Sequence, residues 1–383
     1  MDMRKVLRMR ARSNAGGWPA AARLPGAWLA LVSLAALSPL AAEPSRLEMK
    51  PAEVVGSMRD DTGKPAVDIS GIACAPATAD GMRRCLLVND EDRSAQTANL
   101  DAAGRLIVGP RIPLLGRSAP AGTPGEPQPV TCRSGAAPFR DLDGEGVAFA
   151  APYFYVVGSH ACSRNGKSRD SIFLLARLRT DAKGRAIDAR GRPATGDRKA
   201  RDTVQLTYRL GAALAAAPKV GEWFGRDLDL GGLNVEGVAV IGDTLYAGLR
   251  APALGGETFI VGAKVEALFE ARRGPEEPPV LLNMRLGENT GVRDLAALPD
   301  GRLLVLYGSD RDQPDVPYGL ATLDPRNGSV LKLGELPELA EGGRSGKAEA
   351  VLPLGVEGNR LNVLVFYDSL PEGRPQRLSV PLP

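Results

Sequence analysis

The chain has 383 residues, of which 44% are hydrophobic and 24% are charged, so it can bury the core of one large domain or two ordinary ones. Its 48 basic residues nearly balance 45 acidic ones, and no stripe of lysine and arginine with interleaved aromatic residues occurs, which argues against a nucleic-acid partner. The 45 glycines and 31 prolines favour many tight turns and argue against long helices.

The first 42 residues follow the order of regions found in a secretory signal peptide. Basic residues come first, then the apolar run Ala27–Leu37, then the small residues Ala41 and Ala42. No Arg-Arg pair precedes the apolar run, which favours a Sec-type signal over twin-arginine export. The run is too short to span a bilayer as an uncleaved anchor. We therefore expect a periplasmic or secreted protein of residues 43–383 with no membrane span after cleavage.

β-Hairpins of similar sequence recur along the rest of the chain. The clearest is Leu233–Arg250, in which two apolar runs flank a turn at Gly242-Asp243. The first strands of the five copies begin at Ile69, Gly144, Val235, Val292 and Ala348. A third strand is expected after each hairpin and a fourth in four of the copies. Repeated units of four short strands are typical of the blades of a β-propeller.

The predicted propeller is closed by strands from both ends of the chain. The fifth copy ends after its third strand, and we expect Glu53–Met58 to supply the fourth. Such closure removes two exposed sheet edges. The fold class is therefore an all-β, five-bladed β-propeller forming one domain over residues 43–383, with long loops near 116–140 and 180–202. Six blades, a β-sandwich or a barrel are the alternatives.

Four cysteines, Cys74, Cys85, Cys132 and Cys162, are an even number in an exported chain and indicate disulfide bonds. Cys74 and Cys85 lie on the two arms of one hairpin, so we expect them to pair. Cys132, in a loop rich in proline and glycine, is then left with Cys162. The lack of a Cys-x-x-Cys motif and the single histidine argue against a zinc site.

An acidic residue begins the innermost strand in four of the five copies. These residues are Glu145, Glu236, Asp294 and Glu349, and Ser70 stands in the first copy. Innermost strands line the central channel of a propeller, so the four carboxylates are expected at one mouth of it. Such a ring could hold a calcium or magnesium ion, because both prefer oxygen ligands. The alternative is that each carboxylate caps backbone amides of its own or a neighbouring blade.

Polar side chains also mark the ends of the second strands. They include Asp90, Ser159, His160, Arg250, Asp310 and Asp368. Because the second strand of a hairpin returns to the level where the first began, Glu145 and His160 should be neighbours, as should Glu236 and Arg250. Acids, hydroxyls, an imidazole and a guanidinium on one face are typical of a polar binding site.

His160 is the single histidine, so any histidine general base in this protein must be His160. The alternative is a hydrogen-bonding loop residue. A Gly-x-Ser-x-Gly elbow that would present a serine nucleophile is absent from the sequence. In a metal-assisted hydrolase, the ion on the four carboxylates would polarise a phosphoryl oxygen, Arg250 would bind the anionic group and His160 would shuttle a proton.

Several of these stretches resemble a bacterial family known as domain of unknown function 3616. They are Asp143-Gly-Glu-Gly-Val-Ala, Gly158-Ser-His160, Leu233-Asn-Val-Glu-Gly-Val-Ala, Gly291-Val-Arg-Asp-Leu-Ala and Lys347-Ala-Glu-Ala-Val. The resemblance covers roughly Ile69 to Asp368 and implies a β-propeller without an assigned activity. The chain departs from the family pattern at Ala161-Cys162 and at Glu349-Ala350. A weaker likeness to esterase-like phytase propellers rests on the Glu-Gly-Val-Ala repeats and concerns the fold alone.

Together these features predict a monomeric, exported propeller that binds a small polar ligand or a cation at an acidic face of its central channel. A metal-assisted hydrolase of the phosphoesterase or phytase kind is the alternative. The sequence leaves open whether the protein is an enzyme.

Overall fold

The computed structural model describes residues 47–194, 204–270 and 277–382. The predicted signal peptide, residues 1–42, lies outside this part, as does the end of the predicted 180–202 loop. Within the described segments, no helix is long and apolar enough to cross a membrane.

Five sheets account for most of the described chain; each has four antiparallel strands, and the first also includes a short parallel strand, β2 (Val54–Val55). The first blade contains β3 (Ile69–Cys74), β4 (Arg83–Asn89), β5 (Ser94–Leu100) and β6 (Leu106–Pro113). The second contains β7 (Gly144–Ala150), β8 (Tyr153–Gly158), β9 (Leu175–Arg179) and β10 (Val204–Thr207). The third contains β11 (Asn234–Ile241), β12 (Thr244–Ala251), β13 (Glu257–Lys264) and β14 (Val280–Arg285). The fourth contains β15 (Thr290–Ala297), β16 (Leu303–Ser309), β17 (Gly319–Leu323) and β18 (Val330–Glu335). The fifth contains β21 (Lys347–Glu357), β22 (Arg360–Asp368), β23 (Gln376–Pro381) and β1 (Met49–Pro51).

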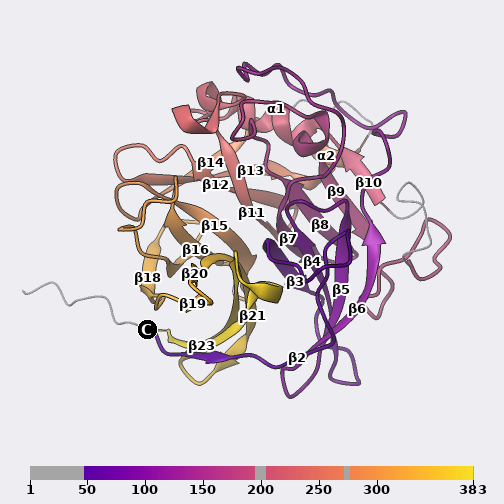
Figure 1. The fold of residues 1–383 in the computed structure, drawn as a ribbon, viewed down its shortest axis with the longest axis vertical. Helices are drawn as coiled ribbons and strands as arrows, with labels where there is room; N and C mark the ends of the chain where they lie inside the picture. Colours follow the sequence, from indigo (N-terminus) through magenta and orange to yellow (C-terminus); the bar gives the residue numbers. More distant parts are fainter. Residues whose placement is uncertain (1–46, 195–203, 271–276, 383) are drawn as a thin grey trace, which may run out of the picture. The chain divides into compact units, whose positions relative to one another are not determined.

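These sheets are arranged around a common centre, with β3, β7, β11, β15 and β21 innermost (Figure 1). Each innermost strand begins within two residues of its predicted start, and the chain then runs outward through each blade. The predicted five-bladed all-β propeller is confirmed, and the six-bladed, sandwich and barrel alternatives are wrong.

The ring is closed by strands from both ends of the chain, but the closing strand differs from the predicted one. Met49 pairs with Leu378, so β1 is the fourth strand of the fifth blade. Within the predicted segment Glu53–Met58, the two-residue strand β2 (Val54–Val55) instead pairs in parallel with β6 of the first blade. The chain crosses from the fifth blade to the first here, so only the residues before the crossing can pair with β23.

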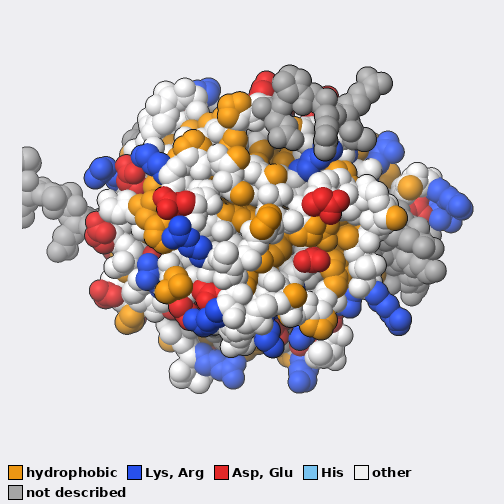
Figure 2. All heavy atoms as spheres, turned by 90° about the horizontal axis from the view of Figure 1, so that it is seen from above, with side chains coloured by type: hydrophobic (Ala, Val, Ile, Leu, Met, Phe, Trp, Pro, Cys, Tyr) orange, Lys and Arg blue, Asp and Glu red, His pale blue; other side chains and the backbone are white. Residues whose placement is uncertain are grey.

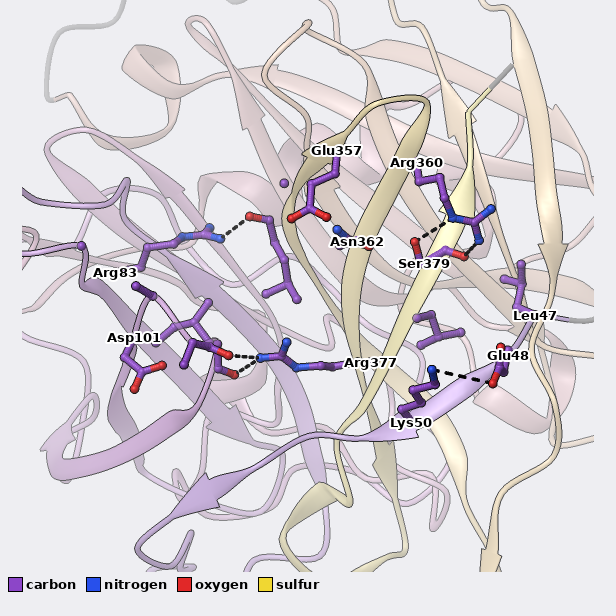
Figure 3. Close-up of a pocket in the computed structure, with 18 of the residues that line it drawn as sticks. Leu47, Glu48, Lys50, Arg83, Asp101, Glu357, Arg360, Asn362, Arg377 and Ser379 are labelled. Atoms are coloured by element: carbon purple, nitrogen blue, oxygen red, sulfur yellow. Dashed lines mark hydrogen bonds and ion pairs between the residues drawn. The ribbon is translucent and has the colours of Figure 1, made fainter.

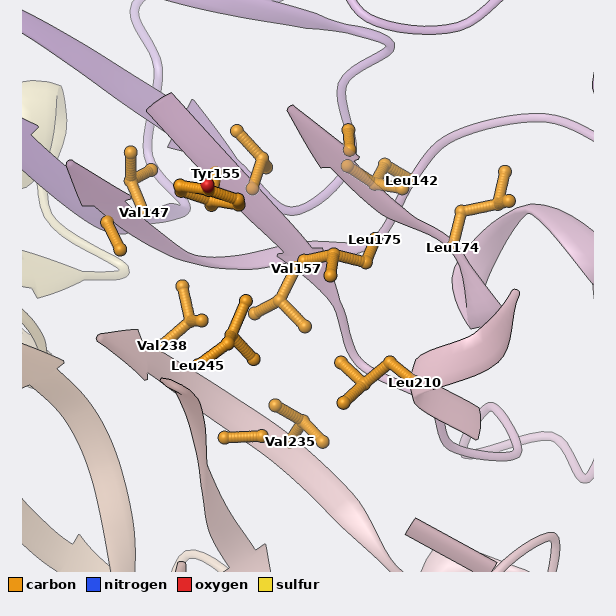
Figure 4. Close-up of a cluster of buried hydrophobic side chains, with 14 of the residues drawn as sticks. Leu142, Val147, Tyr155, Val157, Leu174, Leu175, Leu210, Val235, Val238 and Leu245 are labelled. Carbon is orange, nitrogen blue, oxygen red and sulfur yellow. The ribbon is translucent and has the colours of Figure 1, made fainter. Parts of the chain in front are cut away.

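The hydrophobic core lies between neighbouring blades. In Figure 4, Val147 and Val157 of the second blade pack against Val235, Val238 and Leu245 of the third. These side chains come from strands whose alternate residues face the adjacent sheet, so burial follows the two-residue period of a strand. Each blade is therefore held by its neighbours rather than by a separate core.

The remaining elements lie between strands or beside the blades. They are α1 (Arg209–Ala216), α2 (Val265–Phe269), the hairpin β19 (Ala340–Glu341) and β20 (Arg344–Ser345), and the 3-10 turns η1 (Asp170–Phe173), η3 (Gly221–Trp223), η4 (Leu228–Leu230) and η5 (Pro371–Gly373). Both predicted disulfides are present, Cys74–Cys85 across the first hairpin and Cys132–Cys162 between the 116–140 loop and the segment after β8. The 116–140 loop is also held by the bond from Thr131 N to Gly225 O at 2.8 Å.

Candidate functional site

A β-bulge interrupts the innermost strand of every blade near its start. In the second blade, Gly144 pairs with Gly158 and Gly146 with Val157, which leaves Glu145 without a partner across the ladder. The same one-residue shift occurs in all five blades. The bulged residues are Ser70, Glu145, Glu236, Arg293 and Glu349. A bulge re-aims a side chain, so these five residues form a structurally equivalent set around the axis, here named the bulge ring.

The prediction that placed Asp294 in this ring is wrong by one residue. Val292 pairs with Tyr307 and Asp294 with Leu306, so Arg293 is the bulged residue of the fourth blade. Asp294 is instead equivalent to Gly71, Gly146 and Gly237. Asp294 resembles the glutamates of the ring in charge, but the register of the strand places Arg293 at the bulge.

The glycine after the bulge is required by contact between neighbouring innermost strands. A Cβ atom on Gly146 would lie 2.9 Å from Val238 N, and one on Gly237 would lie 2.6 Å from Leu295 N. Cα atoms of β15 also come within 8 Å of those of β7 and β3 across the ring. The recurring Glu-Gly pair thus has two roles: the glutamate enters the bulge ring, and the glycine lets the strands meet around a narrow axis.

Arg293 links the bulge-ring carboxylates on either side of it. Its side chain is fully buried, and Nη2 lies 3.5 Å from Glu236 Oε2 and also contacts Glu349 Oε1. Glu236 in turn accepts a bond from Arg250 Nη1 at 3.0 Å, which confirms the predicted proximity of these two residues. The carboxylates of the third and fifth blades therefore have basic partners.

A second network extends these pairs across the same end of the blades. Arg250 Nη2 lies 2.8 Å from Asp312 Oδ1, and Lys347 Nζ lies 3.1 Å from the same oxygen. Arg250 Nε also donates to the backbone carbonyl of Asp310 at 2.9 Å. The charges in this part of the ring are thus largely balanced by one another.

Five carboxyl groups from the first, second and fifth blades form no ion pair with a basic side chain among the described residues. This acidic half consists of Asp68, Asp90, Asp143, Glu145 and Asp368. None of the five forms an ion pair within the described part of the chain. The Asp90 Oδ1 atom is buried and has no hydrogen-bond partner among the described residues. No ion pair neutralises these five groups, although the charges of Arg169 and Lys347 partly offset the rise in the pKa of Asp143 and of Asp368.

Burial and mutual repulsion make these groups difficult to ionise. Burial raises the pKa of Glu145 well above its usual range, and the charges of Glu236, Asp143 and Asp90 raise it further. Burial also raises the pKa of Asp90 well above its usual range, with additional repulsion from Asp143 and Asp68. The pKa of Asp368 rises to about 6 through burial and its hydrogen bond with Asp68. At neutral pH, a cation entering the acidic half would stabilise the ionised forms.

The described contacts of His160 are with Gly158, Ile172 and Phe173, and its predicted proximity to Glu145 stays a prediction. Its ring is fully buried, with Nδ1 2.8 Å from Gly158 O and the ring edge against Phe173 at a centroid distance of 6.1 Å. A positive φ of 53° turns the chain at this residue, and burial lowers the pKa of the imidazole to about 4. Ser159 faces the site, because its Oγ donates to Asp143 Oδ2.

The two other predicted ligands have local structural roles. The carboxylate of Asp294 accepts the amides of Leu295 at 2.8 Å and Val351 at 2.7 Å, which is the capping role weighed as the alternative. The carboxylate of Asp310 accepts Gln313 Nε2 at 2.8 Å.

A preformed metal centre is not assembled from the predicted carboxylates. In residues 47–194, 204–270 and 277–382, the one group of three His, Cys, Asp or Glu ligand atoms within 4.8 Å of one another is Cys132, Cys162 and Asp227. The two sulfur atoms of that group are joined in a disulfide. The acidic half therefore presents oxygen atoms that are spread apart.

Sequence reasoning missed Arg293, Asp68 and Lys347. Asp68 directly precedes the innermost strand of its blade, as Asp143 does in the next, and this shared position was a usable signal. Arg293 occupies the bulge position of the fourth blade, and the basic character of its side chain hides its equivalence to the glutamates of the other blades. No sequence pattern marks Lys347, because its ion pair with Asp312 depends on the conformation of the loop that contains Asp312.

The surface gives no sign of a nucleic-acid interface on the face shown in Figure 2. Lysine and arginine side chains there are interspersed with acidic and apolar ones and do not form a continuous basic stripe. This agrees with the near balance of charge in the sequence.

A family model described as Protein of unknown function (DUF3616) matches residues 136–380. No curated protein matches the chain. Among solved structures, the α-L-arabinofuranosidase of Podospora anserina in complex with cellotriose is 12% identical, with a TM-score of 0.46, and the match covers 89% of this chain and 99% of that one. An exo-β-1,3-galactanase from Phanerochaete chrysosporium is 10% identical, with a TM-score of 0.43, over 88% of this chain and 65% of the galactanase. Likenesses at this level assign no activity to this chain.

Proposed function

The chain belongs to the family described as Protein of unknown function (DUF3616), and we propose that it binds an organic cation at the acidic half of its bulge ring. The acidic half is formed by residues of the first, second and fifth blades, and its Glu145 belongs to the same bulge ring as Arg293. A ligand with an ammonium or guanidinium group would provide the basic partners that Asp90 and Glu145 lack.

The observation that carries the proposal is the pair of carboxylates without partners. The side chain of the half-buried Glu145 makes no hydrogen bond or ion pair with any other described residue, and Asp90 Oδ1 is buried without a hydrogen-bond partner. Buried polar atoms are normally paired, and an unpaired buried carboxylate is costly unless it is protonated or meets a cation. A bound cation would therefore satisfy both groups at once.

The spacing of the oxygen atoms favours an organic cation over a bare metal ion. A calcium ion needs six to eight oxygen atoms at about 2.3–2.6 Å, whereas no three carboxyl groups of the described residues each bring an oxygen atom within 4.8 Å of the others. An amine or guanidinium carries several N–H donors that point in different directions and can reach separated carboxylates. Calcium and magnesium are therefore included in the test as the competing ligands.

Isothermal titration calorimetry of the purified protein at pH 7.5 tests the proposal with four probes: arginine, spermidine, calcium chloride and magnesium chloride. We expect at least one organic cation to bind, and Glu145→Gln and Asp90→Asn each to weaken binding by about tenfold or more. Glu266→Gln, which removes an exposed carboxylate of α2, is the matched control and should leave affinity unchanged. Binding of the metal ions alone, or equal affinity in all variants, would overturn the proposal.

The hydrolase alternative has less support from the geometry. It assigned proton transfer to His160, but that ring is enclosed between Phe173 and α1 and is neutral at physiological pH. It also required four carboxylates around one ion, and Asp294 is engaged with two backbone amides.

We also propose that the protein works outside the cytoplasm, in the periplasm or after secretion. All four cysteines are joined in disulfides, and such bonds persist in oxidising compartments. Fractionation of cells that express the full chain, followed by immunoblotting, tests this directly. Detection in the cytoplasmic fraction alone would contradict it.

A further inference from the structure

A cleft of about 740 Å³ opens between the first and fifth blades at the opposite end of the strands from the bulge ring (Figure 3). Glu349 lies near the start of β21, whereas the cleft is lined by the end of that strand, Leu354 to Glu357. The turn between β5 and β6 and parts of β22 and β23 complete its walls. Its volume is within the range of small-molecule sites.

Three guanidinium groups line this cleft, and none forms an ion pair with a carboxylate in the described residues. Arg83 Nη1 donates to Pro353 O at 2.8 Å. Arg377 Nη2 donates to Ala103 O at 3.1 Å and to Gly104 O. Arg360 Nε donates to Ser379 Oγ at 2.9 Å. These neutral acceptors hold the guanidiniums in place without neutralising their charge.

The acidic residues around the cleft do not compensate for these three charges. Asp101 is engaged by Arg105 at 2.8 Å, and Glu48 lies 3.9 Å from Lys50. Glu357 is the remaining acidic residue of the lining and is exposed. Three guanidiniums therefore face one free carboxylate, and the cleft carries net positive charge.

We propose that this cleft binds a small organic anion that carries at least two negative charges on phosphate or carboxylate groups. An arginine has five N–H donors, so each guanidinium keeps donors for an oxyanion after its protein contacts are made. The arginines come from β4, β22 and β23, which suits a ligand with oxyanions at more than one point. Asn362, whose side chain makes no hydrogen bond with another described residue, is available for a neutral polar group of the ligand. This inference is independent of the cation site, because the two sites lie at opposite ends of β21.

Calorimetric titration with inorganic phosphate and with citrate, in a buffer free of other multivalent anions, tests this inference. We expect at least one probe to bind and its affinity to fall as sodium chloride is raised. Preference for phosphate identifies phosphoryl chemistry, and preference for citrate identifies carboxylates. Absence of binding by both probes would overturn the inference.

Substitutions of the arginines that line the cleft test whether the anion binds there. Arg360→Gln, an exposed side chain whose contacts stay within the fifth blade, should weaken binding about tenfold without loosening the seam between blades. Arg83→Gln should do the same, with thermal unfolding measured alongside because Arg83 also joins the first and fifth blades. Glu357→Gln removes the competing negative charge and should tighten binding, while Glu145→Gln should have no effect. Unchanged affinity in both arginine variants would place the anion elsewhere and overturn the inference.

Discussion

Asp294 Oδ2 accepts the backbone amide of Val351 at 2.7 Å, and this bond joins the innermost strand of the fourth blade to that of the fifth. Its other oxygen accepts the amide of Leu295 at 2.8 Å. Asp294 stands at the position that glycine fills in the first three blades. The ring is thus continued here by a buried carboxyl group rather than by direct contact between backbones.

Replacing Asp294 with alanine should destabilise the propeller. Two buried amides would lose their acceptor, and each unsatisfied group costs about 1–3 kcal/mol, so we expect the free energy of unfolding to fall by about 2–5 kcal/mol. Urea denaturation followed by circular dichroism measures this. Asp243→Ala is the control, because Asp243 lies in an exposed turn and pairs only with Thr244 and Lys264. A loss for Asp294→Ala no larger than the control's would contradict the bridging role.

Gly146→Ala and Gly237→Ala should each destabilise the fold by several kcal/mol. The new Cβ atoms would meet backbone atoms of the next blade at 2.9 Å and 2.6 Å, and backbone cannot rotate aside as a side chain can. Gly116→Ala is the matched control, since its nearest neighbour would be Ser118 O at 3.6 Å. Thermal unfolding of the three variants compares them, and equal melting temperatures would show that the innermost strands can separate without cost.

Arg293→Ala should lower the free energy of unfolding by about 3–5 kcal/mol, because it leaves the buried carboxylate of Glu349 without a basic partner and Glu236 with Arg250 alone. Arg302→Ala provides the control, since it removes a half-buried arginine whose partner Asp300 is exposed. The measurement is chemical denaturation at neutral pH. At acidic pH the loss should be smaller, because the carboxyl groups can then take up protons.

The strand pattern and turn positions were sufficient to predict the blades, the closed ring and both disulfides. These features depend on local alternation of apolar residues and on the spacing of repeats, which a sequence displays directly. The closing strand was misplaced because Val54 and Val55 look like any apolar strand, and nothing in the sequence shows which blade they join.

The alternation of apolar residues does not show where a β-bulge lies, and this led to an error in the predicted site. A bulge shifts the register by one residue, which exchanged Arg293 and Asp294 in the predicted ring. The left-handed backbone of His160 and the contact of its ring with Phe173 are likewise not visible in a strand pattern. The sequence did predict that Glu145 and Asp90 lie on the same face. Glu145 is near the start of an innermost strand and Asp90 follows the end of a second strand, and in a hairpin these two ends lie at the same level.

The two disulfides should differ in their contribution to stability. Cys132–Cys162 closes a segment of sequence separation 30 and Cys74–Cys85 one of separation 11, so loop-closure entropy predicts about 4 and about 3 kcal/mol respectively. Paired Cys→Ser variants with one disulfide removed at a time, compared by urea denaturation, test the order. The reverse order would mean that contacts of the 116–140 loop, and not chain entropy, determine the effect.

The stability of the protein should fall as pH rises from about 4 to 7. Asp368 has a pKa of about 6 in the folded protein because of burial and its contact with Asp68, above the ordinary 3.8 of an aspartate. Between these values the folded protein binds more protons than the unfolded chain, so raising the pH favours unfolding. Burial likewise raises the pKa of Glu349 to about 7, which extends the decline to neutral pH.

Asp368→Asn should remove part of this decline, because asparagine mimics the protonated carboxyl group and cannot ionise. We expect the variant to gain on the order of 2 kcal/mol over the wild type at pH 8 and to match it near pH 4. Asp243→Asn is the opposing control: hydrogen bonds from Lys264 and Thr244 lower the pKa of Asp243, so its loss should reduce stability at neutral pH. Urea denaturation from pH 4 to 8 provides both comparisons. Parallel curves for Asp368→Asn and the wild type would show that the ionisation of Asp368 does not oppose folding.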